Sequence, residues 1–242
     1  MQDNIQKNDP AVILFTSGTE SYPKAVPLSH NNILSNHRGS LEAIKLNTSD
    51  ILYGVLPPFH SFGFSVTGLL PLLSGLRVFY APDPTDAHAM AQDCFSKSIT
   101  MIGCAPSFYR NLFHVASPIQ LQQLRLIVSG AEKAHPELFE YAKKYKKLMI
   151  EGYGITECSP IVSINKLEGE AKGVGFPLSN VKLCVIHPET QEKLSQGKQG
   201  EICIMGPGVF QGYLGKNVSN PFVEIDGKKW YKSGDIGRVN ND

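Results

Sequence analysis

Short apolar runs alternate with longer amphipathic stretches between about residues 11 and 164, and this alternation constrains the fold more than any other feature. Six of the runs have the length and composition of β-strands, and the segments between them have the character of helices. Strands that alternate with helices are typical of an α/β layer fold with a mostly parallel sheet. The predicted strands are 11–16, 50–56, 76–80, 100–104, 125–128 and 147–151.

Three of the intervening segments begin with residues that favour a helix start. Ser29 has a side chain that can cap the segment running through Ile33 and His37. Pro106 and Pro136 suit the first turn of a helix, where the missing N–H costs nothing. The sequence therefore predicts helices at about 30–37, 108–115 and 138–146.

The pattern changes after residue 165, where short β-prone runs are separated by Gly, Pro, Asn and Asp. These runs, at 181–186, 201–205 and 229–231, predict a smaller, mostly antiparallel β unit. We therefore expect an α/β subdomain over residues 1–168 and a β-rich subdomain over residues 169–242. The chain stops in a turn-like stretch directly after a strand-like one, so we expect it to be the central piece of a longer protein.

Composition narrows the possible functions. With 42% hydrophobic and 19% charged residues the chain should fold as an ordinary globule. Its formal net charge of +1 gives no reason to expect a nucleic-acid partner. The five cysteines are widely spaced and form no C-x-x-C pair, which indicates neither a disulfide framework nor a zinc site and favours the cytoplasm. The apolar tract at 51–80 is broken by three prolines, so we expect buried core and not a membrane span.

Residues 16–24, Thr-Ser-Gly-Thr-Glu-Ser-Tyr-Pro-Lys, follow a predicted strand and combine hydroxyls, a glycine and a lysine. Such groups suit a loop that wraps a polyphosphate. The segment is not a Walker A loop, because the second glycine and the hydroxyl residue after Lys24 are absent. A polar surface hairpin is the alternative.

Two further clusters carry carboxylates beside glycines. In residues 151–157, Tyr153 could stack on a purine and Glu157 could hold Mg²⁺ whose other ligands are phosphate oxygens. In residues 230–235, Asp235 follows a tight glycine turn and could accept hydrogen bonds from ribose hydroxyls. Taken singly, each cluster could equally be a structural turn.

The three clusters, in this order and at these separations, resemble the adenylate-forming superfamily of acyl-CoA synthetases, luciferases and nonribosomal adenylation domains. Residues 16–24 are similar to its phosphate loop, 153–157 to its Y-G-x-T-E motif and 231–235 to its Y-x-[ST]-G-D motif. Residues 129–132 fall where that family has its adenine-binding turn. The conjunction spans nearly the whole chain and is far more specific than any one motif.

The resemblance implies an ATP- and Mg²⁺-dependent ligase that makes an acyl-adenylate and passes the acyl group to a thiol. It implies that Thr156 positions the phosphates, that Glu157 binds Mg²⁺, that Tyr153 and Gly154 lie at the adenine and that Asp235 holds the ribose. The other implied nucleotide-binding residues are Thr16, Ser17, Gly18, Thr19, Lys24, Gly130, Ala131 and Glu132.

Residues 57–63 are similar to the family's P-x-F-H segment, in which a histidine lines the acyl pocket, and this implies a catalytic-site role for His60. Within the superfamily the chain looks most like bacterial acyl-[acyl carrier protein] synthetases and the bifunctional 2-acylglycerophosphoethanolamine acyltransferases. This implies a long-chain fatty acid as substrate and acyl carrier protein or CoA as acceptor. It leaves open a parent protein at the inner face of the inner membrane. A histidine packed at a strand end is the alternative for His60.

Two further readings of function stay open. The parent could be an amino-acid or aryl-acid adenylation domain of a biosynthetic assembly line, or a non-catalytic nucleotide-binding relative. The second is motivated by Ser21 and Ala25, which stand where the family's phosphate loop usually has glycine and reduce backbone freedom there. The family's hinge and the catalytic lysine of its C-terminal domain would lie beyond Asp242, so we expect the 242-residue piece itself to be inactive.

Overall fold

The structure is a computed structural model that describes residues 4–16, 23–168, 173–215 and 219–240. Its contacts divide the chain into two compact units, each assembled from separate stretches of sequence. Unit 1 comprises Met1–Gly39, Ile155–Val162 and Pro177–Asp242, and unit 2 comprises Ser40–Gly154 and Ser163–Phe176. The grouping therefore differs from a single division of the sequence, and the subdomain boundary between residues 168 and 169 stays a prediction.

A seven-stranded sheet has the strand order β4-β3-β5-β6-β7-β8-β9. The pairs β4/β3, β3/β5, β5/β6 and β6/β7 are all parallel, as the alternating pattern predicts. Every strand predicted between residues 50 and 151 belongs to this sheet. The strands are β3 (Ile51–Gly54), β4 (Arg77–Tyr80), β5 (Met101–Cys104), β6 (Leu126–Ser129), β7 (Leu148–Gly154), β8 (Ile161–Ile164) and β9 (Phe176–Pro177).

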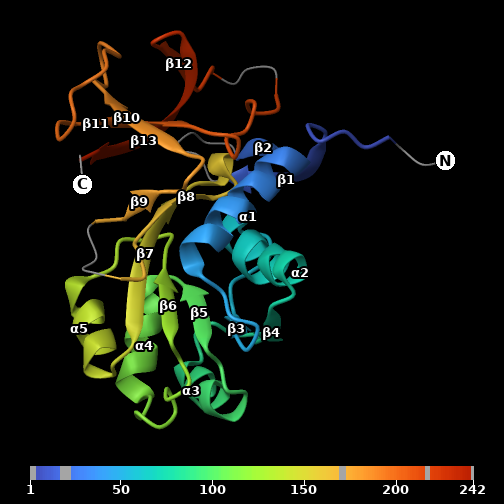
Figure 1. Cartoon of the computed structure of the whole chain (residues 1–242), viewed down its shortest axis with the longest axis vertical. Coiled ribbons are helices and arrows are strands. Elements are labelled where there is room, and N and C mark those ends of the chain that lie inside the picture. Colours follow the sequence, from blue (N-terminus) through green and yellow to red (C-terminus); the bar gives the residue numbers. More distant parts are fainter. Residues whose placement is uncertain (1–3, 17–22, 169–172, 216–218, 241–242) are drawn as a thin grey trace. The chain divides into compact units, whose positions relative to one another are not determined.

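Three helices cover the core of unit 2: α3 (Ala87–Ser96), α4 (Pro106–Val115) and α5 (Pro136–Lys144) (Figure 1). Their apolar faces share one buried cluster with alternate residues of β3, β5, β6 and β7. The fully buried Tyr109 of α4 anchors that helix, since its hydroxyl donates to Val128 O at 2.7 Å and accepts from Cys104 N at 2.8 Å.

The tract between β3 and β4 contains a π-helical segment, η1 (Gly63–Leu69), followed by α2 (Leu70–Ser74). The sequence predicted this tract to be buried core. It is not uniformly buried, because Leu72 is 79% and Phe59 is 81% exposed.

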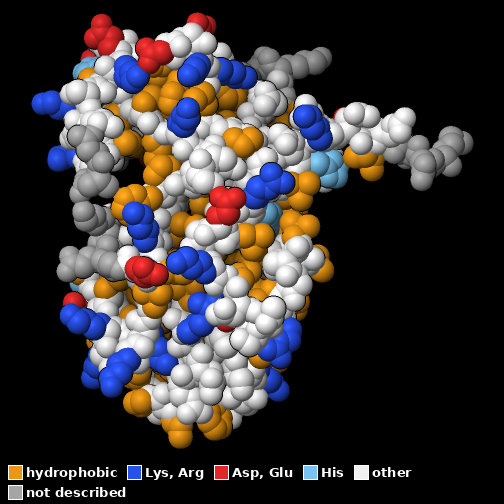
Figure 2. All heavy atoms as spheres, in the orientation of Figure 1, with side chains coloured by type: hydrophobic (Ala, Val, Ile, Leu, Met, Phe, Trp, Pro, Cys, Tyr) orange, Lys and Arg blue, Asp and Glu red, His pale blue; other side chains and the backbone are white. Residues whose placement is uncertain are grey.

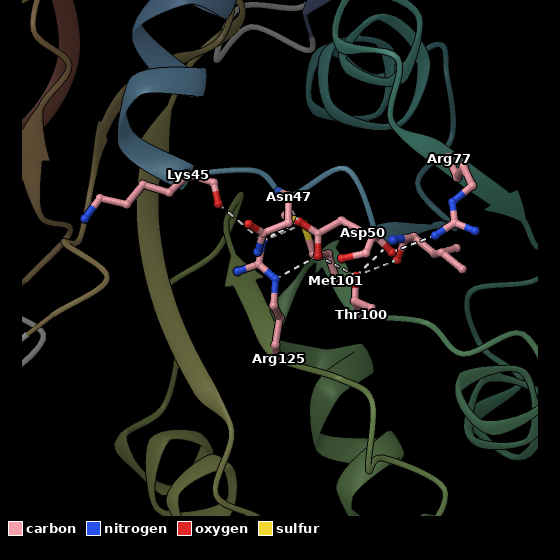
Figure 3. A network of polar contacts seen from close by, with 9 residues as sticks. Lys45, Asn47, Asp50, Arg77, Thr100, Met101 and Arg125 are labelled. Carbon is pink, nitrogen blue, oxygen red and sulfur yellow. Dashed lines mark hydrogen bonds and ion pairs between the residues drawn. The ribbon is translucent and has the colours of Figure 1, made fainter.

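A polar network ties together the ends at which three parallel strands begin (Figure 3). Asp50 precedes β3, Thr100 precedes β5 and Arg125 precedes β6. Arg125 donates to both carboxylate oxygens of Asp50, at 2.7 and 2.5 Å, and Thr100 Oγ1 donates at 2.9 Å. Burial alone would raise the pKa of the Asp50 carboxyl, but the hydrogen bonds from Arg125, Asn47 N and Thr100 outweigh it and lower that pKa.

Unit 1 contains two antiparallel sheets. A two-stranded sheet is formed by β1 (Pro10–Thr16) and β2 (Lys24–Ser29). A four-stranded sheet has the order β10-β11-β13-β12 and confirms the antiparallel β unit predicted after residue 165. Its strands are β10 (Lys182–Ile186), β11 (Gln199–Met205), β12 (Phe222–Ile225) and β13 (Lys228–Arg238).

The first predicted strand, 11–16, is present but is not a member of the layered parallel sheet. It pairs with β2 in antiparallel register, with Thr16 opposite Lys24. The apolar run of β1 favours an extended, partly buried segment. Its partner strand is β2, which the chain forms next, through residues 24–29.

Helix α1 (His30–Ile44) begins where Ser29 was predicted to cap it. The hydroxyl of Ser29 accepts a hydrogen bond from Asn32 N at 3.2 Å and donates one to Asn32 Oδ1 at 2.9 Å. We expect Ser29→Ala to lower the free energy of unfolding by about 1 kcal/mol, because a buried backbone donor loses its partner. Urea unfolding measures this, with Ser74→Ala as a control that removes a hydroxyl at a helix end instead of a start. A change below about 0.3 kcal/mol would contradict the capping role.

No helix in the described part of the chain is both long and apolar enough to cross a membrane. On the face drawn in Figure 2, basic, acidic and hydrophobic side chains are intermixed, in keeping with the formal net charge of +1.

Candidate functional site

The candidate residues in unit 2 all lie at, or shortly after, the carboxyl ends of parallel strands. His60 comes after β3, the turn of Gly130, Ala131 and Glu132 comes directly after β6, and Tyr153 and Gly154 end β7. In open α/β sheets ligands bind outside this edge, because the loops that leave the strands converge there. The sheet therefore gathers these five predicted positions and His60 at one edge.

The turn after β6 is held in shape by a buried carboxylate from β7. Ala131 has a positive φ of 69°, so the chain turns sharply after Gly130. Glu151 is 7% exposed, and its Oε1 accepts a hydrogen bond from Ala134 N at 2.7 Å. Burial raises the pKa of the Glu151 carboxyl. The backbone carbonyl of Glu151 accepts from both Asn165 N and Asn165 Nδ2 at 3.0 Å, so β7 is fixed on the other side as well.

The ring of Phe62 lies close to two glycines, Gly103 within β5 and Gly130 directly after β6. A methyl group on Gly130 would lie 3.3 Å from two atoms of this ring, and one on Gly103 would lie 3.3 Å from Val66 Cγ1 and 4.0 Å from Phe62. Side chains larger than glycine at these positions would press on Phe62. His60 is exposed, and its Nδ1 accepts a hydrogen bond from Phe62 N at 3.2 Å. The side chain of His60 thus accepts a hydrogen bond from the backbone of the turn that leads to Phe62.

In unit 1 the carboxylate of Glu157 is held by a tyrosine 56 positions later in the chain. Glu157 lies in a short 3₁₀ helix, η2 (Thr156–Cys158), and is 7% exposed. Tyr213 Oη donates to Glu157 Oε1 at 2.7 Å and lies 3.3 Å from Tyr231 Oη. Burial, reinforced by the bond to Glu157, raises the pKa of the Tyr213 hydroxyl, which keeps it protonated as a donor at neutral pH.

Phe210 fixes the segment that carries Tyr213. It is 1% exposed, and its N–H donates to Glu157 O at 2.8 Å. Its ring makes edge contacts with Tyr213, at 4.8 Å between centroids, and with Tyr231, at 5.4 Å. Backbone and side-chain contacts therefore both join this segment to Glu157.

Thr16 and Lys24 face each other at the end of the β1/β2 pair, where the chain leaves β1 and enters β2. Lys24 Nζ lies 5.4 Å from the centroid of the Tyr213 ring, and Leu214 N donates to Ala25 O at 3.0 Å. Unit 1 thus brings Lys24 and Glu157 to opposite parts of one tyrosine side chain. The predicted positions Ser17, Gly18 and Thr19, and also Ser21, lie outside the described residues.

Asp235 was predicted to follow a tight glycine turn, and the structure corrects this to a bulge within the long strand β13. The register with β11 shifts between Glu201 and Cys203, so that extra residues of β13 leave the ladder. Gly234, at the bulge, has a φ of 78°, which favours glycine. Its N–H donates to Glu201 Oε1 at 3.1 Å, and Asp235 N donates to Ser233 Oγ at 3.0 Å. The side chain of Asp235 is exposed.

The Glu157 carboxylate fits Mg²⁺ that arrives with a nucleotide. Among the described residues, no group of three or more His, Cys, Asp or Glu side chains could hold a metal ion. Mg²⁺ bound with a nucleotide usually takes one or two carboxylates, with phosphate oxygens and waters as the other ligands. In the described part of the chain Tyr213 is the one hydrogen-bond donor to the Glu157 carboxylate, at Oε1.

Three residues that contribute to this geometry were missed from the sequence: Tyr213, Phe62 and Glu151. Phe62 lies in the segment singled out for His60, but its aromatic ring looked like ordinary core. Glu151 carried a usable signal, because a charge stands in an otherwise apolar strand. Tyr213 carried none, since its partners are 56 and 18 positions away.

Comparisons with known proteins confirm the fold and the resemblance to the adenylate-forming superfamily. A family model described as AMP-binding enzyme matches residues 1–214. The chain is 32% identical over 247 residues to the probable 4-coumarate–CoA ligase 1 of Dictyostelium discoideum, with 98% of this chain and 44% of that protein covered. ATP-bound MatB from Rhodopseudomonas palustris superposes with a TM-score of 0.88 at 28% identity, covering 98% of this chain and 47% of that one.

A long-chain-fatty-acid–CoA ligase, FadD1 from Archaeoglobus fulgidus, superposes with a TM-score of 0.84 at 25% identity. Here 96% of this chain and 49% of the other are covered. The chain thus spans less than half the length of the Dictyostelium ligase and of both solved structures.

Proposed function

The chain belongs to the family of AMP-binding enzymes, and from this premise we propose that it is part of an ATP-dependent ligase that activates a carboxylic acid as its acyl-adenylate. The observation that carries the proposal is the assembly in unit 1, where Glu157 of the Y-G-x-T-E motif and Lys24 of the phosphate loop both contact Tyr213. A carboxylate for Mg²⁺ and a cation for phosphate are the charges that phosphate chemistry requires.

In this reaction a carboxylate oxygen of the acid attacks the α-phosphorus of ATP, and the bond to pyrophosphate breaks. The protein's part is to position groups and to neutralise charge. We assign phosphate contacts to Thr16, Ser17, Gly18, Thr19, Lys24 and Thr156, and the magnesium contact to Glu157. For the nucleoside, Asp235 would hold the ribose, and the adenine would lie against Tyr153, Gly154 and the turn 130–132.

The acid in this proposal is a long-chain fatty acid, and the acceptor is the thiol of acyl carrier protein or CoA. Three observations support it: the apolar ring of Phe62 beside Gly103 and Gly130, the likeness to a fatty-acid ligase and the likeness to a CoA ligase. The alternatives remain an amino-acid or aryl-acid adenylation domain and a relative that binds nucleotide without catalysis.

The full-length protein tests the proposal by exchange of labelled pyrophosphate into ATP. We expect exchange that depends on a fatty acid, with little response to amino acids or to coumarate. Exchange driven by an amino or aryl acid would support the assembly-line alternative. Nucleotide binding without exchange for any acid would support the non-catalytic alternative. The release of AMP is then measured with CoA as the acceptor and, separately, with acyl carrier protein as the acceptor.

Phe62 should influence which acids are accepted. We expect Phe62→Ala to raise the relative kcat/KM for bulkier or longer acids by about tenfold, because removing the ring opens space beside Gly103 and Gly130. Pyrophosphate exchange across a series of chain lengths measures the shift. Phe79→Ala, a partly buried aromatic of β4, is the control for loss of a ring. An unchanged order of preference for acids would remove Phe62 from the pocket.

A further inference from the structure

We propose that Tyr213 is a positioning residue that holds the Glu157 carboxylate in one orientation for magnesium–nucleotide binding. The inference rests on the proposed function and adds a residue from outside the motifs that indicated that function. It follows from three contacts of the Tyr213 side chain, considered in turn.

The first contact is the hydrogen bond from Tyr213 Oη to Glu157 Oε1, at 2.7 Å. A carboxylate whose one oxygen is fixed in this way presents the other oxygen in a defined direction. Outer partners of metal-binding carboxylates commonly have this role, and their removal weakens metal binding. The small exposed fraction of Glu157, 7%, leaves little water to replace the tyrosine hydroxyl.

The second contact joins the hydroxyl of Tyr213 to the hydroxyl of Tyr231. Tyr231 Oη is 3.3 Å from Tyr213 Oη, and both rings pack edge-on against Phe210. Tyr231 is 3% and Phe210 is 1% exposed. Because Tyr213 is enclosed by these rings, its hydroxyl has few other positions to adopt, and the direction of the bond to Glu157 is set in advance.

The third contact joins the carboxylate to the phosphate loop. Lys24 Nζ lies 5.4 Å from the centroid of the Tyr213 ring, and the backbone bond from Leu214 N to Ala25 O keeps β2 beside this segment. One side chain therefore contacts both a cation proposed for phosphate and the carboxylate proposed for Mg²⁺. The hydroxyl acts on Glu157, and the ring acts on Lys24.

Because the hydroxyl and the ring of Tyr213 make separate contacts, a substitution can remove one and keep the other. Tyr213→Phe removes the hydroxyl and keeps the ring over which Lys24 lies. Tyr231→Phe is the matched control, because it removes a neighbouring hydroxyl that has no hydrogen bond to Glu157 among the described residues. Both changes exchange the same groups in the same enclosed cluster, so their general effect on folding should be similar.

The test uses the full-length protein and Mn²⁺ as a paramagnetic probe, with binding of Mn²⁺·ATP followed by electron paramagnetic resonance. We expect Tyr213→Phe to weaken binding about tenfold and to move the Mg²⁺ dependence of pyrophosphate exchange to higher concentration, with most of the rate recovered at saturation. Tyr231→Phe should change both values by less than about twofold. Wild-type affinity and magnesium dependence in Tyr213→Phe would overturn the proposal.

A double-mutant cycle separates positioning from a structural role. In a Glu157→Ala background, Tyr213→Phe should leave the remaining Mn²⁺·ATP affinity unchanged, because its effect passes through the carboxylate. An equal loss in both backgrounds would show a structural role and overturn the inference. A wild-type protein that binds no Mn²⁺·ATP would overturn the proposed function itself, which distinguishes the two failures.

Discussion

Glu157→Gln in the full-length protein should lower the rate of acid-dependent pyrophosphate exchange by about a hundredfold or more. The substitution keeps the size of the side chain and an oxygen that can accept from Tyr213, but it removes the negative charge. If the carboxylate binds Mg²⁺, the ion loses its protein ligand while the fold keeps its contacts. Exchange at several Mg²⁺ concentrations is the measurement.

Glu224→Gln is the control, because Glu224 is an exposed carboxylate on β12 in the same unit. It should leave exchange within about twofold of wild type, as expected for a surface substitution. Glu157→Gln must also keep its midpoint of thermal unfolding, so that loss of activity is not loss of fold. Exchange within threefold of wild type would remove Glu157 from the magnesium site and leave the Y-G-x-T-E motif without that role.

Arg125→Met should lower the free energy of unfolding by about 2–3 kcal/mol. The change leaves the Asp50 carboxylate, whose side chain is 2% exposed, without its charged partner. A fully buried pair broken in this way costs more, about 3–5 kcal/mol, but the Arg125 side chain is 32% exposed and water partly replaces it. Urea unfolding of the protein measures the loss.

The exposed pair of Lys193 and Asp226 supplies the comparison. Its atoms are 2.6 Å apart, but its side chains are 48% and 68% exposed. Lys193→Met should therefore change stability by less than about 0.5 kcal/mol, although the pair is as short as that of Arg125. Equal losses in the two variants would mean that burial of Asp50 does not determine the cost.

The pair of Arg125 and Asp50 also predicts that the stability of the protein depends on pH. The folded pKa of Asp50 is lowered, so its contribution is complete above the unfolded pKa of about 3.9 and is lost as pH falls through the folded value. The stability difference between wild type and Asp50→Asn should therefore be constant between about pH 6 and pH 8 and should shrink below about pH 4. A difference that persists unchanged in acid would contradict the shift.

The sequence predicts strands β3 to β7 of the sheet because each corresponds to a short apolar run, whereas β8 and β9 were not predicted. The predicted runs 100–104 and 125–128, for example, largely coincide with β5 (Met101–Cys104) and β6 (Leu126–Ser129), which are almost entirely buried, as strands covered on both faces are. Pairing is harder to predict. The strand at 11–16 has similar composition, but its partner is β2 and not the parallel sheet. An apolar run determines burial and leaves the choice of neighbour to the rest of the chain.

The motif residues could be proposed from the sequence because their chemistry is concentrated in a few positions, as in residues 153–157. The tyrosine that holds Glu157 is different. Gly212-Tyr213-Leu214 has no unusual composition, and Tyr213 meets Glu157 in a segment where Phe210 N also donates to Glu157 O. Likewise, the bulge at Gly234 depends on a register shift between β11 and β13 that a local pattern does not encode. Contacts between distant segments are therefore what sequence reasoning leaves out.

The assembly of unit 1 from three separated stretches also determines when it can fold during synthesis. The side chain of Asn32, in the first stretch, donates to Pro207 O and Val209 O, which are 175 and 177 positions later. At the usual speed of translation this delay is on the order of ten seconds. Most of unit 2 is one continuous stretch, Ser40–Gly154, which is made before the second and third stretches of unit 1. On a growing chain, the long stretch of unit 2 can therefore begin to fold before Asn32 of α1 meets residues 207 and 209.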